Sequence, residues 1–390
     1  MQETTATIKP KDFRFLSEEE QAIEIAENKQ IQDEYFEVEY AKALMREVLE
    51  PVDQLYFRSE FINFDELPER NQADHPLIYI SNHSGMAFPW DAIMFTGGLY
   101  KRNDYRLAKV TRPLSAPILS QSDLMNPYLI HRLWKKVGGV DATFLNFETM
   151  MHYRDSNVLI YPEGIPGIGK GFNRKYQLQR FATSFIRMSL KYKTDVIPVL
   201  TVNAEYINPY TYSFKFINKW SQKIGLSFIP IGLLTPFLFF VPWLFYYAWP
   251  AKLTFVRGER ISPYKMIVDK PFEEVTEAEI KMIRDQVQLK MQIELDKAVE
   301  KYGRKPLQLK EFIKIIFNNL AAFPYYLPFG WPFTFLDFDR QYRKGVPLED
   351  IRVPKGWGAF WKLLFNNLMA IAFFIPILGW IPILWKGYRK

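Results

Sequence analysis

The chain has 390 residues, of which 48% are hydrophobic and 17% aromatic, enough for a large buried core. Its formal net charge is +7. This charge favours binding to an anionic partner: a nucleic acid, an anionic lipid surface or a phosphorylated substrate. The lack of cysteine excludes disulfides and cysteine-based zinc sites. The first residues carry no apolar signal core, so we do not expect secretion.

The sequence predicts an N-terminal charged helical segment (1–45), in which Ser17 is a candidate helix N-cap. Strands are expected at 56–64, 77–80, 158–161, 195–202 and 251–256. Helices are expected at 144–154, 176–192 and 276–302, and residues 92–137 read as helical segments interrupted by prolines. This alternation predicts an α/β fold in which helices flank a central mixed sheet.

A histidine and an aspartate follow the expected strand 77–80. His83 lies in a polar turn at the end of the strand, and Asp91 lies in the first turn of a helix that begins after Pro89. An imidazole can accept a proton from a hydroxyl, and a carboxylate on its far nitrogen would fix its tautomer. The same two residues could instead cap a turn and a helix, and their spacing alone does not decide between these roles.

A glycine-rich loop at 162–171 follows the expected strand 158–161. Gly164 to Lys170 match the pattern G-x-x-x-x-G-K of a phosphate-binding loop, but Gly171 stands where a hydroxyl should hold the metal ion. The favoured alternative is that Glu163 and Gly164 open an anion-binding loop. The basic residues that would support it are Lys170, Arg174, Lys175 and Arg180.

The stretch 226–249 contains no charged residue and is long enough to span a bilayer. Three prolines interrupt it, and a single crossing would put the expected strand 251–256 on the wrong side of its own sheet. We therefore expect an excursion that lies in the membrane interface. On this interpretation residues 46–303 form the main domain.

The C-terminal region, 304–390, is expected to associate with a membrane. It contains a weak repeat, in which residues 317–320 (FNNL) recur at 365–368 and Pro328 matches Pro376. The repeat is either chance or a sign of two related membrane-facing hairpins or helices. The basic residues around the second stretch, Lys362, Lys386, Arg389 and Lys390, favour entry and exit on one anionic face. A single crossing by 363–385 is the alternative.

Four blocks of the chain, in order, resemble the signature of the lysophospholipid acyltransferases, a superfamily that includes the glycerolipid acyltransferases. The blocks are Asn82-His83 with Asp91, Gly138-Gly139-Val140, Tyr161-Pro162-Glu163-Gly164 and Val196-Ile197-Pro198-Val199. The gap between the histidine and the aspartate holds seven residues in place of four, which resembles a branch that includes diacylglycerol-type acyltransferases. Ile165-Pro166 replaces the Thr-Arg of many phosphate-selecting members, so Arg174 or Arg180 would have to serve instead.

The resemblance covers about residues 45–303. It implies a membrane-associated O-acyltransferase that moves a fatty acyl group from acyl-CoA or acyl-ACP to a lipid hydroxyl, such as that of a lysophospholipid or glycerolipid. His83 would be the base and Asp91 its orienting carboxylate, with an oxyanion donor at Ser84-Gly85 or Lys109. The substrate-binding residues would be Ser84, Gly85, Glu163, Gly164, Lys170, Arg174 and Arg180.

The same resemblance implies no metal, no cofactor besides the donor thioester and no nucleic-acid partner. It implies an anionic membrane surface as partner and an active site on the cytoplasmic side. A hypothesis from another class is a non-catalytic lipid-binding or scaffolding protein that has the same fold.

Overall fold

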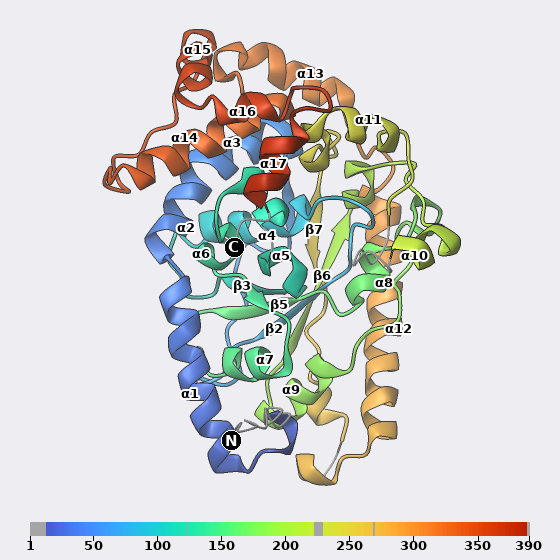
Figure 1. The fold of residues 1–390 in the computed structure, drawn as a ribbon. Helices are drawn as coiled ribbons and strands as arrows, with labels where there is room; N and C mark the ends of the chain where they lie inside the picture. Colours follow the sequence, from blue (N-terminus) through green and yellow to red (C-terminus); the bar gives the residue numbers. More distant parts are fainter. Residues whose placement is uncertain (1–12, 122, 222–228, 268–269, 388–390) are drawn as a thin grey trace, which may run out of the picture.

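The computed structural model describes residues 13–121, 123–221, 229–267 and 270–387. A seven-stranded sheet, ordered β1-β7-β6-β2-β5-β3-β4, lies at its centre (Figure 1). Neighbouring strands are parallel except β6 and β7, which are antiparallel, so the predicted mixed sheet of an α/β fold is confirmed. The strands are β1 (Glu60–Ile62), β2 (Ile78–Ser81), β3 (Thr111–Ser115), β4 (Val140–Asp141), β5 (Asn157–Ile160), β6 (Val196–Val202) and β7 (Thr254–Arg257).

Helices cover both faces of this sheet (Figure 1). The helices before the glycine-rich loop are α1 (Glu18–Tyr35), α2 (Val38–Leu44), α3 (Glu50–Val52), α4 (Trp90–Arg102), α5 (Pro117–Gln121), α6 (Leu133–Lys136) and α7 (Phe144–Met150). Those after it begin with α8 (Gly164–Ile168), α9 (Ser184–Tyr192), α10 (Lys215–Ser221), α11 (Thr235–Phe240) and α12 (Glu277–Tyr302). The C-terminal ones are α13 (Leu309–Asn318), α14 (Trp331–Arg343), α15 (Trp357–Asn366), α16 (Met369–Ala372) and α17 (Trp380–Gly387).

Strand β2 divides two hydrophobic cores because successive side chains of a strand point to opposite faces. Tyr79 belongs to one core, which α4 and α14 line, and Ile78 and Ile80 belong to the other, which α7, α9 and α12 line. Strands β2, β5 and β6 are adjacent, parallel and buried along their whole length. Their carboxyl ends therefore meet at one edge of the sheet, where the loops that follow them come together.

Helices α1 and α12 begin where the sequence predicts, at the expected N-cap Ser17 and at Thr276. Ser17 and Glu20 form a capping box at the start of α1, and Thr276 and Glu279 form one at the start of α12. Each side chain satisfies a backbone N–H group that has no partner within the helix. The predicted starts of these two helices are thus confirmed.

Three element predictions were wrong. The strand predicted at 56–64 is limited to β1, because the chain is helical over Asp53–Phe57 and leaves that helix at Arg58, whose φ is +51°. Within 92–137, β3 replaces an expected helical segment. Pro113 has no N–H to continue a helix, and it lies where the pairing of β3 passes from β5 to β4.

The third wrong prediction is the helix at 176–192, which starts only at Ser184. The backbone N–H groups of Leu178 and Phe181 donate to side chains of α12, and that of Gln179 donates to Glu163. These external acceptors compete with a helical backbone. Part of the predicted glycine-rich loop is helical, because Gly164–Ile168 forms the short helix α8.

The apolar stretch 226–249 is broken at two of its prolines. Residues 226–228 lie outside the described residues; the rest contains α11, with Pro236 in its first turn, and a 3-10 helix at Pro242–Tyr246. Among the described residues, no helix has both the length and the apolar character needed to cross a membrane. Strand β7 follows this stretch and joins the sheet, as predicted.

The C-terminal region makes two kinds of contact. Trp331 and Phe338 of α14 are buried in the same core as Tyr79. The backbone of Trp243 donates to Phe373 at 3.0 Å and that of Ile377 donates to Phe240 at 2.8 Å. The interrupted apolar stretch and the C-terminal helices thus lie together at one end of the molecule (Figure 1). Residues 1–12, Arg389 and Lys390 lie outside the described residues, and the division into domains stays a prediction.

Candidate active site

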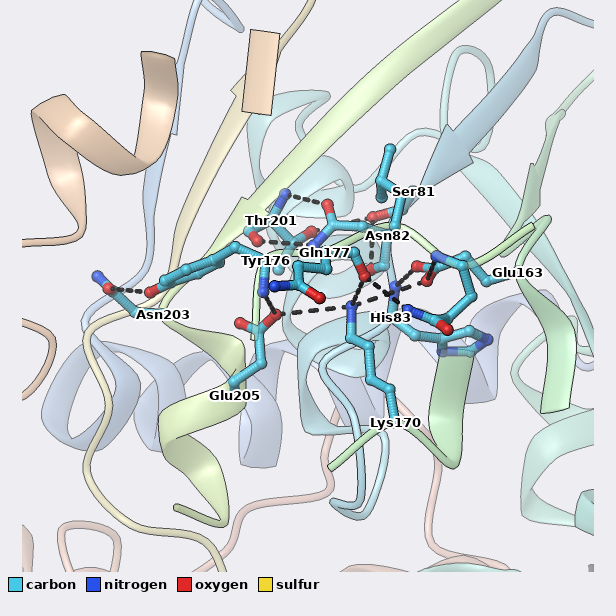
Figure 2. A network of polar contacts seen from close by, with 12 residues as sticks. Ser81, Asn82, His83, Glu163, Lys170, Tyr176, Gln177, Thr201, Asn203 and Glu205 are labelled. Carbon is cyan, nitrogen blue, oxygen red and sulfur yellow. Dashed lines mark hydrogen bonds and ion pairs between the residues drawn. The ribbon is translucent and has the colours of Figure 1, made fainter. Parts of the chain in front are cut away.

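The loop after β2 is held to strand β6 by the side chain of Asn82. Its Nδ2 donates to the Thr201 carbonyl at 2.9 Å, and its Oδ1 accepts from the Thr201 N–H at 2.8 Å. Both groups are buried. This pair of bonds fixes the point at which the chain leaves the sheet, directly before His83 (Figure 2).

The imidazole of His83 is half-buried against Tyr161, the first residue after β5. The ring centroids are 4.6 Å apart and the planes 24° from parallel. On another side lies Gly167 of α8, where a Cβ atom would come within 2.8 Å of the ring carbon Cδ2 of His83. Burial, helped by the charge of Lys170, lowers the pKa of His83 to about 3, so the ring is neutral at physiological pH.

Asp91 is buried in the first turn of α4. It accepts hydrogen bonds from the Ser84 side chain and the Ala92 backbone. Its Oδ2 atom is buried and has no hydrogen-bond partner among the described residues. Burial raises the pKa of Asp91 to about 6, although those hydrogen bonds and the charge of Lys170 oppose the shift.

His83 and Asp91 are brought together around one tyrosine. The charge of Asp91, together with burial, raises the pKa of Tyr161, the ring on which His83 stacks. No direct hydrogen bond joins the imidazole and the carboxylate among the described residues. The loop between them is covered by the apolar stretch, because the indole N–H of Trp90 donates to the Tyr246 carbonyl at 2.9 Å.

Glu163 connects the loops after β2 and β5. Its Oε1 accepts from the His83 N–H at 2.8 Å, and its Oε2 accepts from the Gln179 N–H at 2.7 Å. Burial raises the pKa of Glu163, and the charge of Lys170 opposes this shift. Gly164, the next residue, has a φ of +57° and open space around its Cα. The Glu163 carboxylate therefore positions the backbone of His83.

Lys170 is buried, with 1% of its side chain exposed, between two carboxylates (Figure 2). Its Nζ is 3.7 Å from Glu163 Oε2 and 3.7 Å from Glu205 Oε1. Its carbonyl oxygen would lie 3.2 Å from a Cβ atom at Gly85, whose φ is +86°. Lys170 is thus paired with protein carboxylates, and the residues before it form the helix α8. The G-x-x-x-x-G-K pattern therefore does not form an open phosphate-binding loop.

The predicted site residues thus divide into two groups. His83, Ser84, Gly85, Asp91, Glu163 and Lys170 lie together in or beside this network. Arg174 and Arg180 are exposed and lie outside the network. Arg180 instead lines a surface groove of about 440 Å³ with Arg284 and Gln288.

Lys109, one of the two predicted oxyanion donors, is in the wrong place. Its carbonyl accepts from the side chain of Asn157, the first residue of β5. This is the amino end of a strand whose carboxyl end leads to Glu163, so Lys109 lies across the sheet from His83. Its ammonium pairs with Glu69.

Two residues of the network were not singled out from the sequence. Glu205, shortly after β6, is one, and Tyr161 was seen only as part of a motif. The signal for Glu205 was its position, because an acidic residue at the end of the third strand meets the loops that follow β2 and β5. Within the described residues, no group of three or more histidine, aspartate or glutamate side chains could hold a metal ion.

A family model described as acyltransferase matches residues 61–202. Residues 61–202 form an acyltransferase family domain. This acyltransferase domain runs from β1 to the end of β6 and carries His83, Asp91, Glu163 and Lys170. This match supports the predicted acyltransferase enzyme for this part of the chain.

The chain is also similar to uncharacterized proteins of Mycobacterium bovis, Mycobacterium tuberculosis and Mycobacterium leprae. Each is 24% identical over 210 residues, which are 52% of this chain. The match covers 53% of the first two relatives and 52% of the third, so the chain spans about half the length of the curated relatives it matches. No solved structure matches the chain.

Proposed function

We propose that this chain transfers a fatty acyl group from a thioester, acyl-CoA or acyl-ACP, to the hydroxyl of a lysophospholipid or glycerolipid. One observation carries the proposal. A neutral imidazole, His83, stacks on Tyr161 directly after β2, and the charge of the buried carboxylate Asp91 acts on the same tyrosine. A neutral imidazole can accept the proton of a hydroxyl, which supports general-base catalysis by His83.

In the proposed reaction His83 removes the proton of the acceptor hydroxyl as its oxygen attacks the thioester carbonyl carbon. The tetrahedral intermediate collapses with loss of the thiolate, which takes the proton from the imidazolium. An ester bond forms, the thioester bond breaks and the histidine returns to its neutral state. Asp91 stabilises the imidazolium with its negative charge, and its unpartnered Oδ2 is free to accept an N–H.

The backbone amides of Ser84 and Gly85 are the proposed oxyanion donors. Both residues are buried, and among the described residues neither N–H donates a hydrogen bond. A buried N–H without an acceptor is costly unless a ligand supplies one. These two amides follow His83 directly, so an oxyanion bound there would lie beside the base.

The predicted substrate-binding residues take different parts in this proposal. Glu163 and Lys170 are buried and support the site from inside the protein. At Gly164 no atom lies within 4 Å of the place that a Cβ atom would take. Arg174 and Arg180 are exposed, and they are the candidates to bind the anionic portion of either substrate.

We further propose that the reaction takes place at an anionic membrane surface, with the active site on the cytoplasmic side. The C-terminal repeat supports this. It extends in the structure to 312–320 (FIKIIFNNL) and 360–368 (FWKLLFNNL), and α13 and α15 end at its equivalent asparagines, Asn318 and Asn366. The next asparagines, Asn319 and Asn367, donate to the carbonyl four residues earlier at 2.9 and 2.8 Å. The two copies therefore share a helix end.

The two helices also expose the same positions. Ile313, Phe317 and Leu320 have exposed fractions of 50%, 69% and 48%, and their equivalents Trp361, Phe365 and Leu368 have 59%, 70% and 62%. Such an apolar stripe is unfavourable in water and typical of a helix that lies in a membrane interface. The equivalent lysines, Lys314 and Lys362, are exposed beside the stripes and suit anionic headgroups.

The alternative is a non-catalytic lipid-binding or scaffolding protein. Incubation of the full chain with acyl-CoA or acyl-ACP and a panel of lysophospholipids and diacylglycerol distinguishes the two. The proposal expects a new ester product, detected by mass spectrometry, together with release of the free thiol. Binding of lipid with no ester formed from any donor and acceptor would favour the alternative.

A further inference from the structure

Beneath His83 lies a buried cluster of three charged groups from three different loops. Glu163 follows β5, Glu205 follows β6, and Lys170 follows α8. Their side chains are 0%, 3% and 1% exposed. The ammonium of Lys170 points between the two carboxylates (Figure 2).

The cluster holds the backbone around the imidazole on several sides. Glu163 accepts from the His83 N–H, as described, and Glu205 Oε1 accepts from the Tyr176 N–H at 2.9 Å. The Lys170 ammonium also donates to the Gln177 carbonyl at 3.4 Å. The segment 176–179 is thereby tied to the ends of both β5 and β6. The Lys170 carbonyl lies close to Gly85, two residues after His83, and would be 3.2 Å from a Cβ atom there.

The charges of this cluster do not balance when both glutamates are ionised. Two carboxylates face one ammonium, and Glu205 Oε2 is buried with no hydrogen-bond partner among the described residues. An uncompensated buried charge is costly. Burial accordingly raises the pKa of Glu205 to about 7, with Lys170 opposing and Glu163 adding to the shift. Tyr176 and Tyr206 are the other titratable groups beside it.

We propose that Lys170 and Glu205 are positioning residues of the active site, which fix the His83 backbone through Glu163, and that Lys170 also places a positive charge near His83 and Asp91. This role rests on the proposed function for its effect on turnover. The effect on the His83 ring itself does not depend on turnover, because the cluster contacts the loop whether or not substrate is bound.

Two substitutions separate the charge of Lys170 from the shape of the cluster. Lys170→Met removes the positive charge that lowers the pKa of both His83 and Asp91, so both pKa values should rise. Glu205→Gln keeps the shape and an acceptor for Tyr176. Glu205, with a pKa of about 7, is already mostly protonated where Asp91 and His83 titrate, so this substitution should leave both pKa values close to those of the wild type. Lys170→Met should also lower kcat, by up to about 100-fold, because a small misplacement of a catalytic base has a cost of that order.

Lys252→Met is the matched control. Lys252 is likewise a buried lysine paired with two carboxylates, Glu60 at 2.7 Å and Glu311 at 3.1 Å, but its partners lie outside the His83 network. It should lose stability without a change in the pH profile. Circular dichroism and thermal unfolding of each variant identify any that do not fold.

The experiment measures the pH profile of kcat/KM and, by NMR of ¹⁵N-histidine-labelled protein, the protonation of the His83 ring. We expect the acid limb of kcat/KM and the His83 titration to move to higher pH in Lys170→Met and to stay close to the wild type in Glu205→Gln. If folded Lys170→Met shows the pH profile and the His83 titration of Lys252→Met, the proposal is overturned. A wild-type protein without turnover would contradict the proposed function alone, since the NMR titration still tests the positioning role.

Discussion

Burial sets the protonation states of His83 and Asp91. It lowers the pKa of the imidazole to about 3 and raises that of the carboxylate to about 6. The imidazole is thus free of a proton at neutral pH, and the carboxylate is the one of the two that titrates near neutrality.

This assignment predicts the pH dependence of the wild-type enzyme. As the pH falls through about 6, Asp91 takes up a proton and loses the charge that stabilises the imidazolium, so kcat/KM should fall with a midpoint near pH 6. Protonation of His83 itself should contribute only near pH 3. The measurement is kcat/KM from pH 4.5 to 8 with the acceptor found by the panel.

Asp91→Asn is the control for this profile. It should have low activity with no acid limb over the same range, because the titrating carboxylate is gone. An acid limb at the same midpoint in this variant would assign it to a different group.

Sequence patterns predicted the central residues of the site but not which of its side chains pair with one another. His83, Asp91 and Glu163 each follow or begin an element whose position the α/β pattern indicates. Glu163 accepts from the His83 N–H, and the charge of Asp91 acts on Tyr161, the ring on which His83 stacks. Lys170 was expected to bind an anionic ligand, since the basic residues around it suggested an anion site. Its pairing with Glu205 depends on two strands being neighbours in space, which a local pattern does not contain.

Among the secondary-structure elements, helix α12 is one whose bounds can be predicted from local sequence signals. Its start and end follow from the Thr276 capping box and from Gly303, and its buried face includes Ile283, Met291 and Leu295. Strand β3 shows the opposite case. Its sequence, TRPLS, has no apolar run or alternation, and it becomes a strand because β5 and β4 supply partners on both sides.

The cap of α12 gives a prediction at this scale. Thr276→Ala removes the side-chain acceptor for the Glu279 N–H and should lower the free energy of unfolding by about 1 kcal/mol. Chemical denaturation measures this change. Thr276→Ser keeps the hydroxyl and should stay close to the wild type; equal losses in both variants would show that the cap is not the cause.

The whole molecule has apolar helices gathered at one end, away from the lower part of α12 (Figure 1). The sequence predicted an apolar C-terminal region but not that α14 would be buried in the main core, because composition does not distinguish a core helix from a membrane-facing one. The stripes of α13 and α15 are exposed, which supports the proposed membrane contact for these residues.

These stripes predict binding to lipid vesicles. Trp361→Ser with Phe365→Ser removes two large exposed apolar side chains, each worth about 1.5–3 kcal/mol when buried, so partition onto anionic vesicles should weaken roughly tenfold or more. Vesicle sedimentation measures the partition. Met282→Ser with Ile293→Ser removes comparably exposed residues of α12 and should leave it unchanged. Equal binding by both double variants would exclude the stripe on α15 as the contact surface.

The central claim is that His83 is the base of an acyl transfer. Its most direct measurement is ester formation from acyl-CoA or acyl-ACP, with the acceptor found by the panel, by the wild type, His83→Ala and His131→Ala. His131 is an exposed histidine that pairs with Asp123, outside the His83 network. We expect His83→Ala to fold and to lose at least ~100-fold in turnover, while His131→Ala stays near the wild type. Wild-type turnover in a folded His83→Ala variant would contradict the mechanism.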